Sequence, residues 1–210
     1  SMTPDRAGQV HNGADDNASG TSGLIEIAEK LSLGKAKLKR SILFVAFAGE
    51  ELGLLGSTYF VNNPPVKKES MVAMVNMDMV GRVRENHLTV GGVGTAKVFK
   101  ALMEKLVKDS SLNVTLQETG FASSDNAPFT ANKIPAVFFF SGTHGQYHTP
   151  DDDWNLINAE KGAEVLNLTS ATLQAFANLD EKPQFASSGA AGMRRGRMGG
   201  NRPWFGSTPD

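Results

Sequence analysis

The 210-residue sequence contains no cysteine. Disulfides and thiolate metal sites are therefore excluded, and a transition metal could be held only by His, Asp and Glu side chains. No apolar run approaches the roughly 18 residues that a membrane-spanning helix needs. The formal net charge of −1 lacks the basic excess typical of nucleic-acid binders. We therefore expect no nucleic-acid partner and no membrane-spanning segment.

The apolar residues alternate between strand-like runs and helix-like spacing. Strands are expected at 41–49, 71–81, 87–92, 112–118 and 135–142. Helices are expected at 24–31, 52–62, 95–108 and 159–177, the third with Val98, Leu102 and Leu106 facing inward. Strands that alternate with helices predict an α/β fold, in which a mostly parallel twisted sheet is covered by helices on both faces.

The composition divides the chain into three segments. Residues 1–12 are polar and begin with a sequence typical of a tag-cleavage remnant, so we expect a disordered or cloning-derived leader. Residues 13–180 carry the alternating pattern and form the expected domain. Residues 181–210 are rich in glycine and arginine without periodicity, which is typical of a tail or linker.

Carboxylates lie close to the ends of two expected strands and before the first helix. Glu50 and Glu51 directly follow one apolar strand, and Asp78 interrupts the end of another. Asp15 and Asp16 lie in a glycine-bracketed turn at a helix start. Because ligands of open α/β sheets gather beyond the carboxyl ends of the strands, these acids are expected to converge there.

Converging carboxylates require a compensating charge. Several ionised acids within ~4–6 Å of one another repel and raise each other's pKa, and a divalent cation offsets that repulsion. His148, which follows the last strand, is a candidate nitrogen ligand. Mixed His and carboxylate donors are typical of catalytic zinc.

Each of these residues also has a structural explanation. The aspartates before the first helix could cap it. Glu50 and Glu51 could be first-turn acids that the dipole of the following helix stabilises. His148 alone could be an exposed loop residue. Asp78 is the hardest to explain structurally, because a lone carboxylate in an apolar strand is costly to bury. Their combination favours a metal site.

The ordered motifs GADDNASG, FVAFAGEELGLLGS, NMDMVGR and YHTPDD resemble those of the M28 family of zinc metallopeptidases, in the C-terminal portion of its catalytic domain. The resemblance covers residues 13–177 in motif order and spacing. It implies a zinc-exopeptidase-like fold of the phosphorylase/hydrolase-like type, and an activity that removes N-terminal residues from a peptide substrate.

The resemblance also implies a role for each acidic residue and for the histidine. It implies two zinc ions bridged by Asp15 and by a water or hydroxide. Glu51 and His148 would complete the ligands of the first ion, and Asp78 would bind the second. Glu50 would be the general base that takes a proton from the bridging water and passes it to the leaving amine.

Two further features follow from the resemblance. It implies a cis peptide bond between Asp15 and Asp16. Tyr147 matches a tyrosine that stabilises the tetrahedral intermediate in some relatives, although it could equally be an aromatic side chain packed under the loop. The segment 124–126 matches a Ser-Asp-His segment near the pocket, but with asparagine in the third place, and no role is assigned to it.

One family feature is missing from the sequence. The H-x-D motif that supplies another zinc ligand upstream of GADD has no counterpart, because His11 lacks an aspartate two positions later. We therefore expect a domain truncated at its N-terminus, with a sheet that lacks one or more strands. Such a chain would bind one zinc ion and have little peptidase activity, whereas the full-length protein would bind two.

The leading hypothesis is a zinc-dependent aminopeptidase. A single-zinc acyltransferase of the glutaminyl-cyclase type and a non-catalytic binding module on the same fold are the alternatives. By resemblance, the full-length protein would be secreted or periplasmic, and a PDZ-like domain could follow residue 210.

Overall fold

A four-stranded mixed sheet forms the centre of the computed structural model, which describes residues 6, 8–34, 37–120 and 123–187. The strand order is β1-β4-β2-β3. β1 (Met74–Met77) is parallel to β4 (Ala136–Phe140), β2 (His87–Gly91) is parallel to β3 (Asn113–Leu116), and β2 is antiparallel to β4. Two of these three pairings are parallel, so the expected α/β class with a mostly parallel sheet is confirmed.

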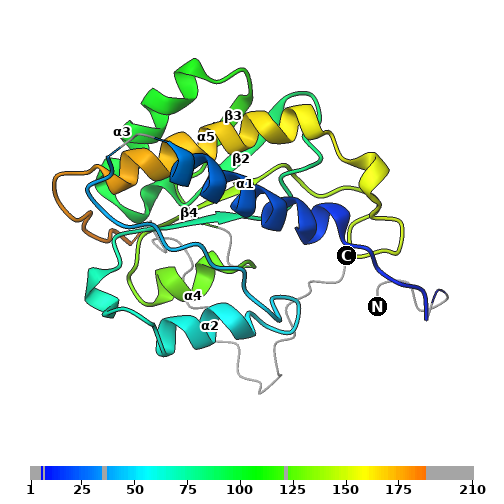
Figure 1. Cartoon of the computed structure of the whole chain (residues 1–210), viewed down its shortest axis with the longest axis horizontal. Coiled ribbons are helices and arrows are strands. Elements are labelled where there is room, and N and C mark those ends of the chain that lie inside the picture. The colour runs from blue at the N-terminus through cyan, green and yellow to red at the C-terminus, as the bar shows by residue number, and fades with distance from the viewer. Residues whose placement is uncertain (1–5, 7, 35–36, 121–122, 188–210) are drawn as a thin grey trace, which may run out of the picture.

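Helices cover both faces of the sheet (Figure 1). One face carries α1 (Gly20–Leu33), α3 (Lys97–Leu106) and α5 (Ala159–Ala177), and the other carries α2 (Leu55–Asn62) and α4 (Asn126–Ala131). A kinked turn occupies Ala14–Ser19, with Asp16 and Asn17 outside the helical φ/ψ region. Short 3-10 turns occupy Lys68–Ser70, Val93–Thr95, Val107–Asp109 and Trp154–Leu156. Among the described residues, no helix is long and apolar enough to cross a membrane.

Helices α2 and α4 differ from the helices predicted from the sequence. α2 begins at Leu55 instead of residue 52, because Gly53 and Leu54 have φ of 101° and 58°, outside the helical region. α4 was not predicted, because its six residues are too few to show a periodic pattern. Most of the segment 181–210 lies outside the described residues.

The main core lies between the sheet and the helices α3 and α5. Phe99 and Phe176 stack there with ring centroids 4.1 Å apart and planes at 11°. The prediction of which α3 residues face inward was partly wrong. Leu102 and Leu106 pack against this core, but Val98 is 44% exposed while Phe99 and Met103 are fully buried.

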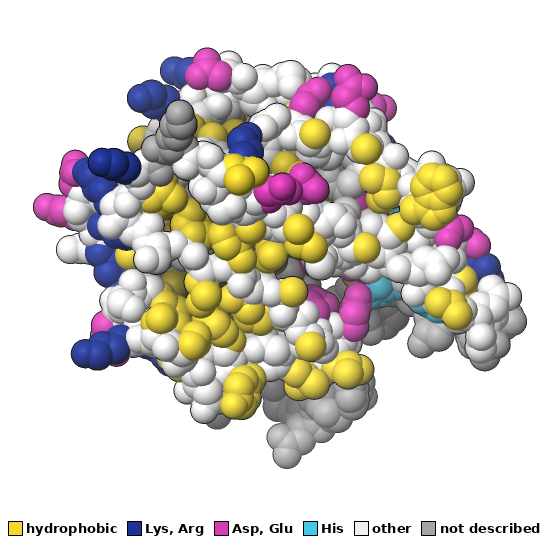
Figure 2. Space-filling model, viewed as in Figure 1, with side chains coloured by type: hydrophobic (Ala, Val, Ile, Leu, Met, Phe, Trp, Pro, Cys, Tyr) yellow, Lys and Arg dark blue, Asp and Glu magenta, His cyan; other side chains and the backbone are white. Residues whose placement is uncertain are grey.

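The apolar segment 41–47 is not a strand, contrary to the prediction. It forms no ladder with any described residue and none of its side chains is fully buried. β1 is the nearby edge strand of the sheet, and both segments line one cavity of about 1200 Å³. A strand needs a neighbouring backbone with which to pair. Segment 41–47 has no such partner among the described residues. Figure 2 shows the apolar band on this face, with acidic side chains and a histidine at its right-hand end.

Candidate metal centre

Three side chains from distant parts of the chain converge at one end of this apolar band. Nε2 of His148 lies 2.9 Å from Oε1 of Glu51 and 3.2 Å from Oδ2 of Asp16. One donor atom from each residue lies within 4.8 Å of the others, and the described residues contain no other such group of three. The two carboxylates raise the pKa of His148 to about 10, with Asp16 the larger influence.

The local backbone turns each of the three side chains towards the others. Glu51 follows the extended segment 41–47, and His148 lies in the loop after β4 with a left-handed φ of 55°. The side chain of Asn17 fixes the Asp16 turn to the end of β1, since its amide donates to the carbonyl of Met77 at 2.9 Å. The site therefore lies where the ends of β1 and β4 meet the start of α1.

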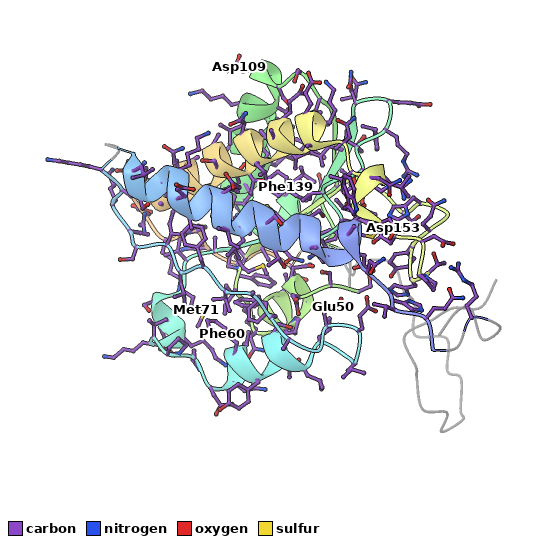
Figure 3. All side chains as sticks on the ribbon, turned by 45° about the vertical axis from the view of Figure 1, so that its right-hand side comes forward. Glu50, Phe60, Met71, Asp109, Phe139 and Asp153 are labelled. Atoms are coloured by element: carbon purple, nitrogen blue, oxygen red, sulfur yellow. The ribbon has the colours of Figure 1, made fainter. Side chains whose placement is uncertain are left out.

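Glu50 lies beside this group, in a more enclosed position. Figure 3 places its label below the N-terminal end of α1 and next to α4. Burial raises the pKa of Glu50 to about 8, and the negative charge of Asp78 is the next largest cause. A partly buried carboxylate that prefers to be protonated is suited to proton transfer.

Asp78 is held by a buried polar network. Its Oδ2 accepts a hydrogen bond from Oγ of Ser124 at 2.8 Å, and that hydroxyl accepts from the amide of Asn76, also at 2.8 Å. Burial raises the pKa of Asp78 to about 6. Its other oxygen, Oδ1, is buried and accepts no hydrogen bond from a described residue. That oxygen is available to a cation.

Asp15 is not part of the convergent group, contrary to the sequence-based assignment. It is fully buried, and its Oδ1 accepts from the backbone N–H of Gly81 at 2.7 Å. Its neighbour Asp16 occupies the expected position instead. The cis peptide bond is likewise one residue further along than expected, between Asp16 and Asn17.

Tyr147 packs directly against the histidine of the group. The rings of Tyr147 and His148 are stacked, with centroids 3.7 Å apart and planes at 23°. Burial, followed by the charge of Asp16, raises the pKa of the Tyr147 hydroxyl, which is therefore a hydrogen-bond donor at neutral pH. The stacking supports the orientation of the imidazole, and this effect does not depend on any hydrogen bond that the hydroxyl makes.

The donor set fits a divalent transition metal. Two carboxylates and an imidazole within ligand distance of one another match the mixed oxygen and nitrogen coordination that zinc accepts. Without a cation, a proton on His148 balances the carboxylates of Asp16 and Glu51, as its raised pKa indicates. Glu51, Asp16 and His148 would hold the metal, and the unpaired oxygen of Asp78 lies in the same acidic surroundings.

The comparison with protein families decides the classification. The chain matches the family described as "Peptidase family M28" over residues 3–173. The chain belongs to peptidase family M28. The curated relatives include aminopeptidase YwaD of Bacillus subtilis, which is 33% identical over 187 residues; the match covers 82% of this chain and 39% of that protein.

Solved structures of this family have the same fold. The LapA aminopeptidase of Legionella pneumophila superposes with a TM-score of 0.71 at 28% identity, covering 81% of this chain and 48% of that one. BSAP, a zinc aminopeptidase from Bacillus subtilis, gives 0.69 at 28% identity, covering 82% and 46%. The chain thus spans less than half the length of these relatives. A glutaminyl cyclase of Porphyromonas gingivalis, at 19% identity and a TM-score of 0.58, shares the fold.

Sequence reasoning left several residues around the site without a role. Asp125, in the segment 124–126, is half-buried beside Glu50, and its buried Oδ1 accepts no hydrogen bond from a described residue. His144 and Asp152 are also buried, behind the Asp16 turn. The run of three aspartates at 151–153 was visible in the sequence, but nothing local distinguished its central member.

Proposed function

We propose that this chain carries the zinc-binding and proton-transfer residues of an aminopeptidase. The observation that supports the proposal is the convergence of Asp16, Glu51 and His148, with the half-buried Glu50 beside them. Membership of family M28, and relatives named as aminopeptidases, agree with it.

The adjacent glutamates have separate tasks in this proposal. Glu51 is a ligand, while Glu50 takes a proton from the attacking water and passes it to the leaving amine. In the metal-free chain the pKa of Glu50 is raised to about 8, and a bound cation would lower it towards neutral pH, where the group must both accept and release a proton. A bound zinc ion supplies Lewis acidity for the scissile carbonyl and for the water.

We propose one zinc ion for this chain and two for a complete site. Asp78 offers a free oxygen, but the described residues place no histidine beside it in a second group of three. Turnover by this chain is accordingly expected to be low. Peptides with a free N-terminus are the proposed substrates, and a secreted or periplasmic location remains a proposal from resemblance.

The test combines zinc stoichiometry with hydrolysis of an aminoacyl arylamide. We expect one equivalent of zinc, which is lost in Asp16→Asn, Glu51→Gln and His148→Asn and retained in Glu50→Gln. Glu50→Gln should lower the residual hydrolysis by ~10²–10⁴-fold. Zinc binding that survives all three ligand substitutions would contradict the assignment, as would full hydrolysis in Glu50→Gln.

The same assays separate the alternative acyl-transfer chemistry. A single Asp-Glu-His metal site is also what a glutaminyl-cyclase-type enzyme would use. An N-terminal glutaminyl peptide that cyclises and is not cleaved, in wild type but not in Glu50→Gln, would favour that chemistry over peptide hydrolysis.

A further inference from the structure

A second buried polar cluster lies directly behind the Asp16 turn. Asp15, His144 and Asp152 are 0%, 8% and 1% exposed. They come from the turn before α1 and from the loop after β4. None of the three belongs to the convergent group of Asp16, Glu51 and His148. Burying ionisable side chains is costly unless they are hydrogen-bonded or paired, so the partners of these three groups explain their burial.

Asp152 binds the backbone of the turn that carries Asp16. Its Oδ2 accepts the N–H groups of both Asp15 and Asp16, each at 3.0 Å. Its own carbonyl accepts from the N–H of Ala14, also at 3.0 Å. Three successive N–H groups therefore point at one residue. Hydrogen bonds to a carboxylate are stronger than bonds to a neutral acceptor, so Asp152 fixes the turn firmly.

His144 connects Asp152 to Asp15, and Arg82 determines which nitrogen of its ring carries the proton. Nη1 of Arg82 lies 2.9 Å from Nδ1 of His144 and donates to Gln146 at 2.8 Å. Since a guanidinium can only donate, Nδ1 must accept, and the ring proton is on Nε2.

That nitrogen faces two carboxylates. Nε2 of His144 lies 3.2 Å from Oδ2 of Asp15 and 3.9 Å from Oδ1 of Asp152. Neither atom of the closer contact makes a regular hydrogen bond with a described residue, so the contact is a close approach of donor and acceptor at 3.2 Å. The buried imidazole thus lies between the two carboxylates, and its Nε2–H faces both of them.

We propose that Asp152 and His144 are positioning residues, which hold the carboxylate of Asp16 in place for the metal. The inference rests on the proposed ligand role of Asp16. Without the Asp152 acceptor, the buried N–H of Asp15 and the partly buried N–H of Asp16 would lose their partner, and the turn would move to satisfy them. Without His144, Asp15 and Asp152 would be adjacent acids with no donor between them.

The test compares two neighbouring aspartates. Asp152→Asn keeps the size of the side chain and one acceptor oxygen, but it removes the charge that strengthens both hydrogen bonds to the turn. Asp153→Asn is the matched control, because Asp153 is partly exposed and, among the described residues, its side chain accepts only from Asn12, at 2.6 Å. Figure 3 labels it near the start of α1. We expect zinc affinity, measured by competition with a chelator, to fall ~10–100-fold in Asp152→Asn only.

Cobalt provides a readout that a general loss of stability would not change. The visible spectrum of Co²⁺ bound in place of zinc reports ligand geometry and should change in Asp152→Asn but not in the control. Wild-type zinc affinity together with an unchanged cobalt spectrum in Asp152→Asn would overturn the inference. Zinc binding that survives Glu51→Gln would instead refute the proposed ligand set, so the two failures are distinguishable.

Two substitutions of His144 keep the inference testable if Asp152→Asn does not fold. Glutamine offers one acceptor for Arg82 and one donor for Asp15, whereas leucine offers neither. His144→Gln should retain zinc affinity within a few-fold of wild type, and His144→Leu should lose it as Asp152→Asn does. Equal zinc affinities in the two variants would contradict a positioning role.

Discussion

The imidazole nitrogen Nε2 of His148 lies 2.9 Å from Oε1 of Glu51, across 97 residues of sequence. This contact joins the loop after β4 to the turn after the segment 41–47. Each residue perturbs the other in the direction expected of an ion pair: the pKa of Glu51 is lowered by His148, and that of His148 is raised to about 10 by Asp16 and Glu51. A divalent cation between them would replace the proton.

The first prediction uses the two adjacent glutamates as a matched pair. Zinc at 100 times its dissociation constant should stabilise the wild-type protein by about 2.7 kcal/mol. The stabilisation should persist in Glu50→Gln and vanish in Glu51→Gln, because Glu51 is the one of these two glutamates that contacts His148. Thermal melting with zinc and with a chelator measures it. A zinc-induced shift that disappears in Glu50→Gln and remains in Glu51→Gln would reverse the two roles.

The second prediction concerns the metal-free protein. The pKa of Glu50 is raised by burial and by Asp78 to about 8, above its ordinary value of 4.5. A raised folded-state pKa means that stability is fully present below pH ~4.5 and is lost as the pH rises through ~8. Glu50→Gln lacks this loss, so it should be more stable than wild type at pH 8 and similar at pH 5.

Melting in chelator at the two pH values measures this difference. Because Glu50 is partly solvated, we expect only about 1 kcal/mol, or roughly 2–4 °C, at pH 8. A Glu50→Gln protein that melts at or below the wild-type temperature at pH 8 would show that the carboxylate is not under strain. Asp153→Asn serves as the control, because Asp153 is not among the charges that raise the pKa of Glu50.

The third prediction tests the core that supports the site. Phe176 stacks on Phe99 at 4.1 Å and is 4% exposed. Phe176→Ala should cost ~3–5 kcal/mol of unfolding free energy, since it leaves a cavity beside a fully buried ring. Val98→Ala, on the exposed face of the same helix α3, should change stability by less than ~0.5 kcal/mol. Denaturant unfolding distinguishes them, and equal costs would contradict the observed burial.

The sequence was sufficient where a pattern is long and repeated. Helix α5 was predicted at 159–177 and is observed at Ala159–Ala177, because five turns of apolar spacing leave little ambiguity. The segment 41–49 has an equally strong strand composition, yet it forms no strand. Its composition favours burial in a sheet, but pairing depends on a neighbour that no local pattern reveals.

The choice between Asp15 and Asp16 illustrates a second limit. Both lie in the same turn, and neither spacing nor residue type indicates which carboxylate faces the metal group. The decision depends on the backbone dihedrals, with Asp16 at φ −110° and ψ 89°. It also depends on Asp152, which holds both N–H groups. That residue is 136 positions away, so only the folded chain could show that Asp16, and not Asp15, lies beside Glu51 and His148.

The last prediction separates the two explanations of Tyr147. Phenylalanine keeps the ring that stacks on His148 at 3.7 Å but removes the hydroxyl. If that hydroxyl donates to a tetrahedral species, Tyr147→Phe should weaken binding of an aminoalkyl boronic acid, which mimics such a species, about tenfold, corresponding to a hydrogen bond of about 1.4 kcal/mol. Zinc affinity should be unchanged. Tyr147→Ala also removes the stacking and should weaken zinc binding as well. Equal inhibitor binding by wild type and Tyr147→Phe would leave Tyr147 with the packing role alone.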